Sequence, residues 1–233
     1  MAIVQENMQV IFDHPKSIFS TLTPEEKTDL LNNITIKDYL KDDFIFKEGE
    51  KPIGFQFLAS GKVMIYKEGA GGRDQIIRMT KPMGIIGYRA LLAQEPHIGT
   101  AVALERSIVY SVSPEYFFHR LLKNADFSLR LLQVLSRELG FSNARTVNLT
   151  QKHIRGRLAE SLLLLKEKYG FENDGATLKV YLSRDEIANL SSMNTSNAIR
   201  TLTSFTSERI IATDGRKIRI LDISKLEDIS KNG

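Results

Sequence analysis

The feature that most constrains the fold is an abrupt change of pattern at Ser113-Pro114. From Tyr39 to Pro114, apolar residues come in short runs that Gly, Pro and Asp interrupt, whereas helix-forming residues dominate from Tyr116 to Leu149. Short runs with closely spaced turn residues are typical of a small β-sandwich or β-barrel. We therefore expect an α+β protein in which a β domain precedes a long helix. The expected strands are Asp43–Phe46, Gly54–Leu58, Val63–Tyr66, Gln75–Met79, Ile85–Ile86, Thr100–Leu104 and Ile108–Val112.

The segment before the β domain, residues 1–40, is predicted to be helical. Thr23-Pro24-Glu25-Glu26 supplies an N-cap residue, a proline at the first helical position and acidic residues in the first turn. Within the β domain, Gly69–Gly72 separates two expected strands and predicts a hairpin tip.

The helix after the β domain is predicted to break near Asn124, where Asp126 can cap a second piece that reaches Leu149. This piece of about 24 residues would be roughly 36 Å long at 1.5 Å per residue. Because one small β domain cannot cover both faces of such a helix, we expect a coiled coil between two subunits. The alternative, a core helix of one large domain, is disfavoured because no other apolar segment has equal length. The leucines close to heptad spacing are Leu131, Leu132, Leu135, Leu139 and Leu149.

Composition excludes several kinds of chemistry. The 233 residues include no cysteine, which excludes disulfides, thiolate catalysis and Cys-ligated zinc or iron–sulfur clusters, and fits a cytoplasmic location. No apolar stretch is long enough to span a membrane, and the N-terminal MAIVQENMQVIFDHPK lacks the pattern of a signal peptide. The common nucleotide-binding, hydrolase and metalloprotease motifs are also absent, so we expect neither an enzyme nor a metal site.

The last part of the chain, residues 150–233, has the order of elements of a winged helix-turn-helix. Ser183 and Glu186 form a capping-box pattern, and Asp214-Gly215 is a strong hairpin signal. The expected elements are helix Gln151–Tyr169, strand Thr177–Leu182, helix Ser183–Ser191, helix Thr195–Phe205 and a hairpin of Arg209–Thr213 with Ile218–Asp222.

This unit has the residues that a DNA-binding surface needs. It holds 14 basic and 11 acidic residues, which is +3 of the net charge of +4. Ile187, Leu190, Ile199 and Leu202 are predicted to form the inner face of the two central helices. Arginine can bind guanine and asparagine can bind adenine in the major groove, while hydroxyls and wing cations suit phosphate. The predicted DNA-binding residues are Ser183, Arg184, Asn194, Thr195, Ser196, Asn197, Arg200, Thr201, Arg216 and Lys217.

Three segments of this unit carry a family resemblance, Arg155–Ala159, Leu182–Ala188 and Met193–Phe205. In the β domain, Phe46–Glu50, Ser60–Val63 and Pro82–Tyr88 add to it. Over roughly Phe44 to Leu221, the chain resembles the cyclic-AMP receptor protein/Fnr (Crp/Fnr) family of bacterial transcription regulators. The resemblance implies a β-roll (jelly-roll) domain of the cyclic-nucleotide-binding type over residues 1–115, a hinge and dimerisation helix over 116–149, and a winged helix over 150–233. It also implies a homodimer on pseudo-palindromic DNA, with RNA polymerase as a further partner of an activator.

The chain departs from the cyclic-AMP-binding members of that family. Tyr88 stands where their ribose-binding Glu lies, and Ile98-Gly99 occupies the position of their phosphate-binding Arg-Ser pair. We therefore do not expect cyclic AMP to bind in the usual mode, and the effector stays unknown. In the long helix, Ser142 and Asn143 match the positions that contact adenine. The candidate effector-pocket residues are Ile86, Gly87, Tyr88, Arg89, His97, Gly99, Thr100, Ser142 and Asn143.

Two alternatives stay open at this point. A haem-based sensor would need an axial ligand, for which His97 is the best candidate because its segment should lie near the effector pocket. A module that regulates a protein partner is also possible, since winged helices also serve in protein contacts, although the polar face of Thr195–Phe205 favours DNA.

Overall fold

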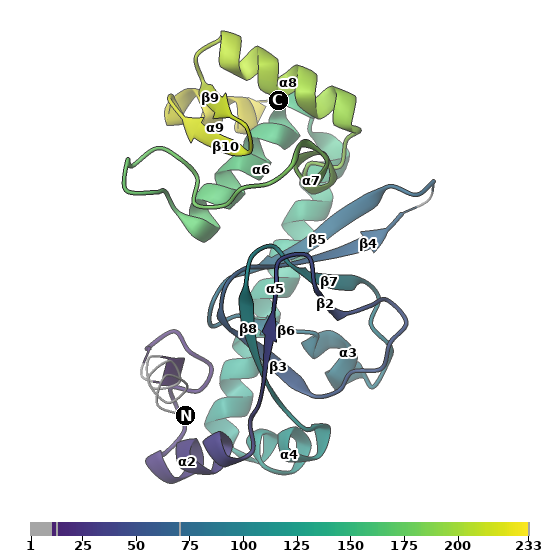
Figure 1. Cartoon of the computed structure of the whole chain (residues 1–233), viewed down its shortest axis with the longest axis vertical. Coiled ribbons are helices and arrows are strands. Elements are labelled where there is room, and N and C mark those ends of the chain that lie inside the picture. Colours follow the sequence, from purple (N-terminus) through teal and green to yellow (C-terminus); the bar gives the residue numbers. More distant parts are fainter. Residues whose placement is uncertain (1–10, 13, 70, 233) are drawn as a thin grey trace. The chain divides into compact units, whose positions relative to one another are not determined.

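The structure is a computed structural model that describes residues 11–12, 14–69 and 71–232 (Figure 1). The expectation of no signal peptide rests on residues 1–16, of which 1–10 and 13 lie outside the described residues, as does Ala70 in the predicted hairpin tip. The chain divides into two compact units, residues 1–67 with 77–139, and residues 68–76 with 140–233. Within the described ranges, no helix is both long and apolar enough to cross a membrane.

The first unit is built on two four-stranded sheets (Figure 1). One sheet has the order β1-β8-β3-β6 and the other β2-β7-β4-β5, and part of the β4–β5 hairpin belongs to the second unit. The seven expected strands are confirmed within two residues at each end. The strands are β1 Thr35–Tyr39, β2 Phe44–Phe46, β3 Phe55–Ser60, β4 Val63–Glu68, β5 Asp74–Thr80, β6 Ile85–Ile86, β7 Thr100–Ala103 and β8 Ser107–Val112.

Strand β1 corrects the prediction that residues 1–40 are helical. Helix α2 spans Pro24–Asn32, with Thr23 as the predicted N-cap and Pro24 at the predicted first helical position. Thr23 and Glu26 also form a capping box, which was not predicted from the sequence. Thr35–Tyr39 instead pairs antiparallel with β8, with Ile36 opposite Tyr110. Four of the five β1 residues are exposed, so this edge strand lacks the alternation of buried and exposed positions by which strands are recognised in a sequence.

Short helices connect the strands and lead to the long helix. They are α3 Tyr88–Ala93, α4 Pro114–His119 and the 3-10 turn Leu121–Lys123. Helix α5, Ala125–Gln151, has 27 residues. Its cap is Asn124 rather than the predicted Asp126, because the Asn124 Oδ1 atom accepts a 2.9 Å hydrogen bond from the Phe127 amide. Asp126 lies in the first turn, where its negative charge suits the helix dipole.

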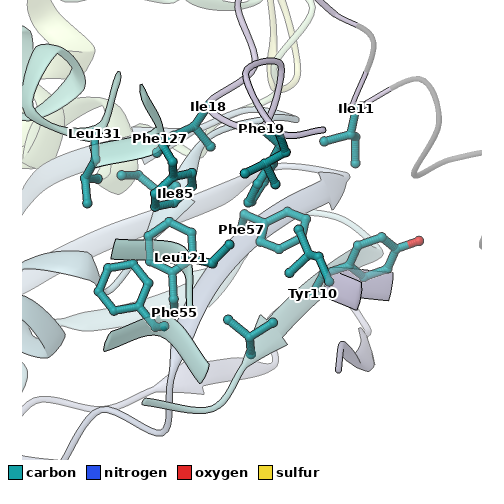
Figure 2. Close-up of a cluster of buried hydrophobic side chains, with 14 of the residues drawn as sticks. Ile11, Ile18, Phe19, Phe55, Phe57, Ile85, Tyr110, Leu121, Phe127 and Leu131 are labelled. Atoms are coloured by element: carbon teal, nitrogen blue, oxygen red, sulfur yellow. The ribbon is translucent and has the colours of Figure 1, made fainter. Parts of the chain in front are cut away.

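An aromatic core holds α5 against the sheets of the first unit (Figure 2). Phe55 and Phe117 stack at 4.6 Å between ring centroids, and Phe127 of α5 contacts Phe55 at 6.2 Å. Leu131 is 3% exposed in this same core. The prediction that Leu131 belongs to an intersubunit seam is therefore wrong, since residues 127 and 131 lie on the helix face that packs on the β domain. Leu132 and Leu139 are 60% and 63% exposed.

The second unit contains a helix-turn-helix with a β-hairpin. The predicted strand Thr177–Leu182 is wrong. Leu178 pairs with Phe171 and Thr177 with Arg219, so two isolated bridges to different partners replace a continuous ladder. Helix α9 was not predicted; it packs on α6 and buries Leu226 completely. The elements are α6 Ile154–Tyr169, α7 Arg184–Leu190, α8 Thr195–Ser207, β9 Ile211–Asp214, β10 Lys217–Ile220 and α9 Ile223–Asn232.

Candidate DNA-binding surface and effector positions

Helix α7 begins at the predicted capping box. The Ser183 hydroxyl accepts a 3.1 Å hydrogen bond from the Glu186 amide, and the Glu186 carboxylate accepts from the Ser183 amide. Ser183 therefore uses its hydroxyl to start the helix. Two buried side chains of α7, Ile187 and Leu190, form the inner face as predicted.

The start of α8 is fixed by side chains that the sequence assigned to DNA. The Asn194 Oδ1 atom accepts a 2.8 Å hydrogen bond from the Asn197 amide, which makes Asn194 the N-cap. The Thr195 hydroxyl donates a 2.6 Å hydrogen bond to the Asp185 carboxylate and so joins α8 to α7. The Thr195 contact helps to hold the two helices in their relative orientation, and the Asn194 cap fixes where α8 begins.

The buried stripe of α8 differs from the predicted inner face, which contained Ile199 and Leu202. It consists of Ala198, Thr201, Leu202 and Phe205, whose spacing of three and four residues is that of one helix face. Thr201, predicted to face DNA, is only 8% exposed, and its hydroxyl donates to the Asn197 carbonyl. Ile199, predicted to lie inside, is 46% exposed, because it lies about 100° around the helix from Ala198.

The outer face of α8 is consequently a small set of exposed side chains. Ser196 and Arg200, which the sequence predicts, lie on it one turn apart, and Asn197 at its edge is half-buried. Ile199 and Thr203 lie on the same face and were missed as candidates for DNA contact. The helix carries no acidic residue between Thr195 and Ser207, so this face does not repel phosphate.

The β9–β10 hairpin forms the wing. Asp214 pairs with Lys217, so the turn residues are Gly215 and Arg216, one position later than predicted. Arg216 and Lys217 are exposed at the tip. Arg219 is exposed on the same face of β10 as Lys217. It was not predicted as a DNA contact, although the two-residue period of a strand places it on the face of Lys217.

Arg184 supports the wing. Its Nη2 atom donates a 3.0 Å hydrogen bond to the Gly215 carbonyl, and its Nη1 atom is buried without a hydrogen-bond partner among the described residues. The sequence predicts Arg184 as a DNA contact. In the structure, one nitrogen of the guanidinium instead links the start of α7 to the tip of the wing.

Arg155 fastens α8 to α6. It donates hydrogen bonds of 2.6 Å to the Ser204 hydroxyl and 2.9 Å to the Glu208 carboxylate, and its guanidinium lies 4.9 Å from the centroid of the Phe205 ring. The hydrogen bond from Arg155 is the main reason that the pKa of Glu208 falls to about 2. This clamp explains the arginine that begins the motif Arg155–Ala159.

The end of α7 has a second support. Arg145 of α5 donates hydrogen bonds of 2.9 Å to the Leu190 carbonyl and 2.6 Å to the Ile76 carbonyl. Gln75 donates a 2.8 Å hydrogen bond to the Asn189 carbonyl. These carbonyls belong to the C-terminal end of α7 or to β5, so hydrogen bonds within the second unit join the C-terminal part of α5, the start of β5 and the helix-turn-helix.

Among the effector positions, His97 is a packed side chain. It is 5% exposed, and its ring stacks on Phe46 at 3.6 Å between centroids with a 6° interplanar angle. Gly87 has a left-handed backbone with φ of 66°, and a Cβ atom there would lie 2.9 Å from the His97 ring. Burial lowers the pKa of His97, and the charge of Glu50 opposes this in part. Packing against an apolar ring therefore favours the neutral form of the imidazole.

Tyr88 is joined to two residues that the sequence did not identify. Arg78 donates a 2.6 Å hydrogen bond to the Tyr88 hydroxyl and a 2.9 Å hydrogen bond to the Glu138 carboxylate. The side chains of Arg78 and Glu138 are 15% and 31% exposed. Burial raises the pKa of Tyr88. We call Arg78, Tyr88 and Glu138 the Arg78 cluster.

The remaining effector candidates lie apart from this cluster or are used elsewhere. Ile86 is fully buried in a separate apolar cluster, and Arg89 is ion-paired with Glu95 on the surface. A side chain at Gly99 would lie 2.6 Å from the Tyr66 carbonyl. The Thr100 hydroxyl accepts a 3.1 Å hydrogen bond from the Glu48 amide. Ser142 and Asn143 belong to the second unit and are exposed.

These residues do not fit a cyclic nucleotide bound in the usual mode. The position that would supply a carboxylate for the ribose holds the Tyr88 hydroxyl, which already accepts from Arg78. At the phosphate position, Ile98 is exposed and Gly99 has no room for a side chain beside the Tyr66 carbonyl. A cyclic phosphate would meet no cation from this pair of residues.

Fold and site together define a class of protein, a two-part regulator with a cyclic-nucleotide-binding-type domain and a winged helix-turn-helix. Residues 36–124 match the family of cyclic nucleotide-binding domains, and residues 156–229 match the Crp-like helix-turn-helix domain. The chain belongs to the Crp/Fnr family of transcription regulators, whose members bind DNA as dimers and are not enzymes.

Individual relatives agree with this assignment. The chain is 24% identical over 210 residues to the CRP-like cAMP-activated global transcriptional regulator of Mycobacterium tuberculosis, covering 90% of this chain and 94% of the relative. It is 25% identical over 183 residues to the transcriptional activator protein Anr of Pseudomonas protegens, covering 78% and 75%. The structure of FixK2 from Bradyrhizobium japonicum shares the fold, with a TM-score of 0.74 at 21% identity over 84% of this chain and 96% of that one.

Proposed function

We propose that the chain binds a pseudo-palindromic DNA site as a homodimer, with α8 of each subunit in the major groove and the wing against phosphate. The observation that carries this proposal is the outer face of α8, where Ser196 and Arg200 are exposed beside a helix start free of acidic residues. Arg216, Lys217 and Arg219 add cations on the wing. Because bacterial DNA lies in the cytoplasm, the proposal implies a cytoplasmic protein. If the protein is an activator, RNA polymerase is a second partner.

The test is the salt dependence of DNA binding. Neutralising phosphates releases counterions, so log K against log salt should fall with a slope of about −0.9 for each phosphate contacted. Promoter fragments of the source organism would be titrated with the full chain from low to high salt. Equal affinity at all salt concentrations, or no binding to any fragment, contradicts the proposal.

The exposed leucines of α5 support the dimer. Leu129, Leu132 and Leu139 are 55%, 60% and 63% exposed and are separated by three and seven residues, the spacing of a coiled-coil seam. Burial against the same face of a second subunit would remove them from water. Sedimentation at micromolar concentration should give twice 26.3 kDa. A species at the mass of one chain would contradict the seam.

For regulation, we propose an effector other than cyclic AMP bound in the usual mode, or none. The support is the Arg78 cluster, in which the Tyr88 hydroxyl accepts a hydrogen bond from Arg78 of the same chain. Thermal unfolding of the full chain with millimolar cyclic AMP should give the same midpoint as without it. A large rise in the midpoint would overturn this part of the proposal.

The haem-sensor alternative has less support. An axial ligand needs a ring nitrogen directed at open space, whereas the His97 ring is buried and stacked on Phe46. A module for a protein partner would not need an arginine on the outer face of α8, so the DNA-binding proposal accounts for more of the structure.

A further inference from the structure

The position of Ile199 is the least expected feature of α8. The buried stripe of the helix leaves this branched aliphatic side chain 46% exposed, at one edge of the face that carries Ser196 and Arg200. A single exposed aliphatic residue is ordinary on a protein surface. On this face, however, every exposed side chain is a candidate for contact with base edges, because the proposed function puts the face in the major groove.

The threonine hydroxyls of α8 are used in hydrogen bonds within the protein, which makes the surroundings of Ile199 more apolar than the sequence suggests. Thr203, one turn later, donates its hydroxyl to the Ile199 carbonyl at 3.0 Å, so its methyl group is the branch left without a polar role. Thr201 donates to the Asn197 carbonyl and Thr195 to the Asp185 carboxylate. Ile199 therefore forms the main apolar surface on the outer face of α8, and Arg200 is its charged neighbour.

The major groove offers one kind of apolar group at base edges, the C5 methyl of thymine. Isoleucine placed over any other edge would cover amino or carbonyl groups and remove their water without replacing the hydrogen bonds. Placed over a thymine methyl, it removes apolar surface of both partners from water. The side chain thus distinguishes thymine from the other bases both by attraction and by exclusion.

We infer that Ile199 is a specificity-determining residue that reads a thymine methyl, at a base pair next to the one that Arg200 contacts. The inference rests on the proposed DNA binding and adds one position to the recognised sequence. Burial of one methyl group is worth about a fourfold change in affinity. A homodimer on two half-sites should lose on the order of tenfold when both methyls are removed.

The experiment separates the methyl from every other feature of the base. A preferred site is first selected from a random DNA library with the full chain, and each symmetric pair of thymines is then replaced by deoxyuridine, which lacks only the methyl. We expect one pair to weaken binding by about tenfold, and the others to have little effect. The Ile199→Ser variant should bind the thymine and deoxyuridine forms of that pair equally.

Two further variants keep the result unambiguous. Ile199→Val retains an aliphatic side chain and should keep most of the discrimination. Arg200→Ala should lose preference at its own base pair and keep the thymine effect, with circular dichroism confirming that each variant is folded. Equal binding of all deoxyuridine sites by the unmodified chain, a selected site without thymine, or discrimination retained by Ile199→Ser overturns the inference alone. Failure to enrich any sequence overturns the proposed DNA binding as well.

Discussion

Arg78 donates a 2.6 Å hydrogen bond to the hydroxyl of Tyr88, in a cluster completed by Glu138. The three residues belong to β5, α3 and α5. The Tyr88 hydroxyl is therefore engaged by a side chain of the same unit. The chain's own side chains thus join the β domain to the N-terminal half of the long helix.

Replacing Tyr88 by Phe should destabilise the first unit by about 1 to 3 kcal/mol, because a partly buried guanidinium loses a hydrogen-bond acceptor. Urea unfolding of the full chain measures the change. The matched control is Arg89→Ala, which removes an ion pair whose two side chains are about half exposed, and which should cost less than about 1 kcal/mol. Equal costs for the two variants would mean that the Arg78 cluster does not hold these elements together.

The Arg78 cluster also marks the limit of what the sequence predicts. Arg78 and Glu138 are 60 residues apart, and no motif relates them. Helix caps and glycine-punctuated strands involve neighbours in sequence, which is why the Thr23 N-cap, the Ser183–Glu186 capping box and seven of the eight strands in the two four-stranded sheets were predicted. A tertiary ion pair has no such local signature.

The errors in the DNA-binding unit have a related cause. Ile199 was assigned to the core because it is apolar. The face of α8 that is buried, however, is the one that carries Ala198, Leu202 and Phe205. A shift of one residue turns a side chain by about 100°. Arg184 was predicted as a DNA contact, and the structure adds a contact with the Gly215 carbonyl that depends on how the wing folds back, which the sequence alone does not specify.

Acidification should destabilise the first unit through His97. Burial lowers the pKa of His97, so the unfolded chain takes up the proton first as the pH falls. The neutral ring contributes fully to the free energy of unfolding at pH values above 6.5, the ordinary pKa of histidine. This contribution is lost as the pH falls from 6.5 through the lower pKa of the folded state. Urea unfolding at pH 7.5 and 5.5 measures the loss.

The variant His97→Phe has no titrating group at this position and should lose less stability between these two pH values than the unmodified chain. His119 is exposed, so His119→Gln serves as the matched control and should keep the pH dependence of the unmodified chain. A pH dependence that is the same in all three proteins would assign the effect to groups other than His97.

The wing offers two arginines with different predicted roles. Arg216→Ala should leave the unfolding free energy unchanged and reduce the slope of log K against log salt by about 1 for each subunit. Arg184→Ala should cost about 1 to 2 kcal/mol of stability, because it leaves the Gly215 carbonyl without this hydrogen bond. Unfolding and DNA titrations on both variants distinguish the roles, and a stable Arg184→Ala protein with a reduced salt slope would make Arg184 a phosphate contact.

Arg200→Ala should weaken specific binding by about 1 to 3 kcal/mol per half-site and relax preference at one base pair. The reason is geometric: Arg200 is exposed on the outer face of α8, one residue from Ile199, while Arg155 fastens the C-terminal end of the helix through Ser204 and Glu208. Binding to the selected site and to single-base variants of it measures both effects. The control Thr203→Val changes the same face without removing charge and should keep the preference at that base pair. If Arg200→Ala weakened binding to every sequence equally, Arg200 would contact phosphate rather than a base.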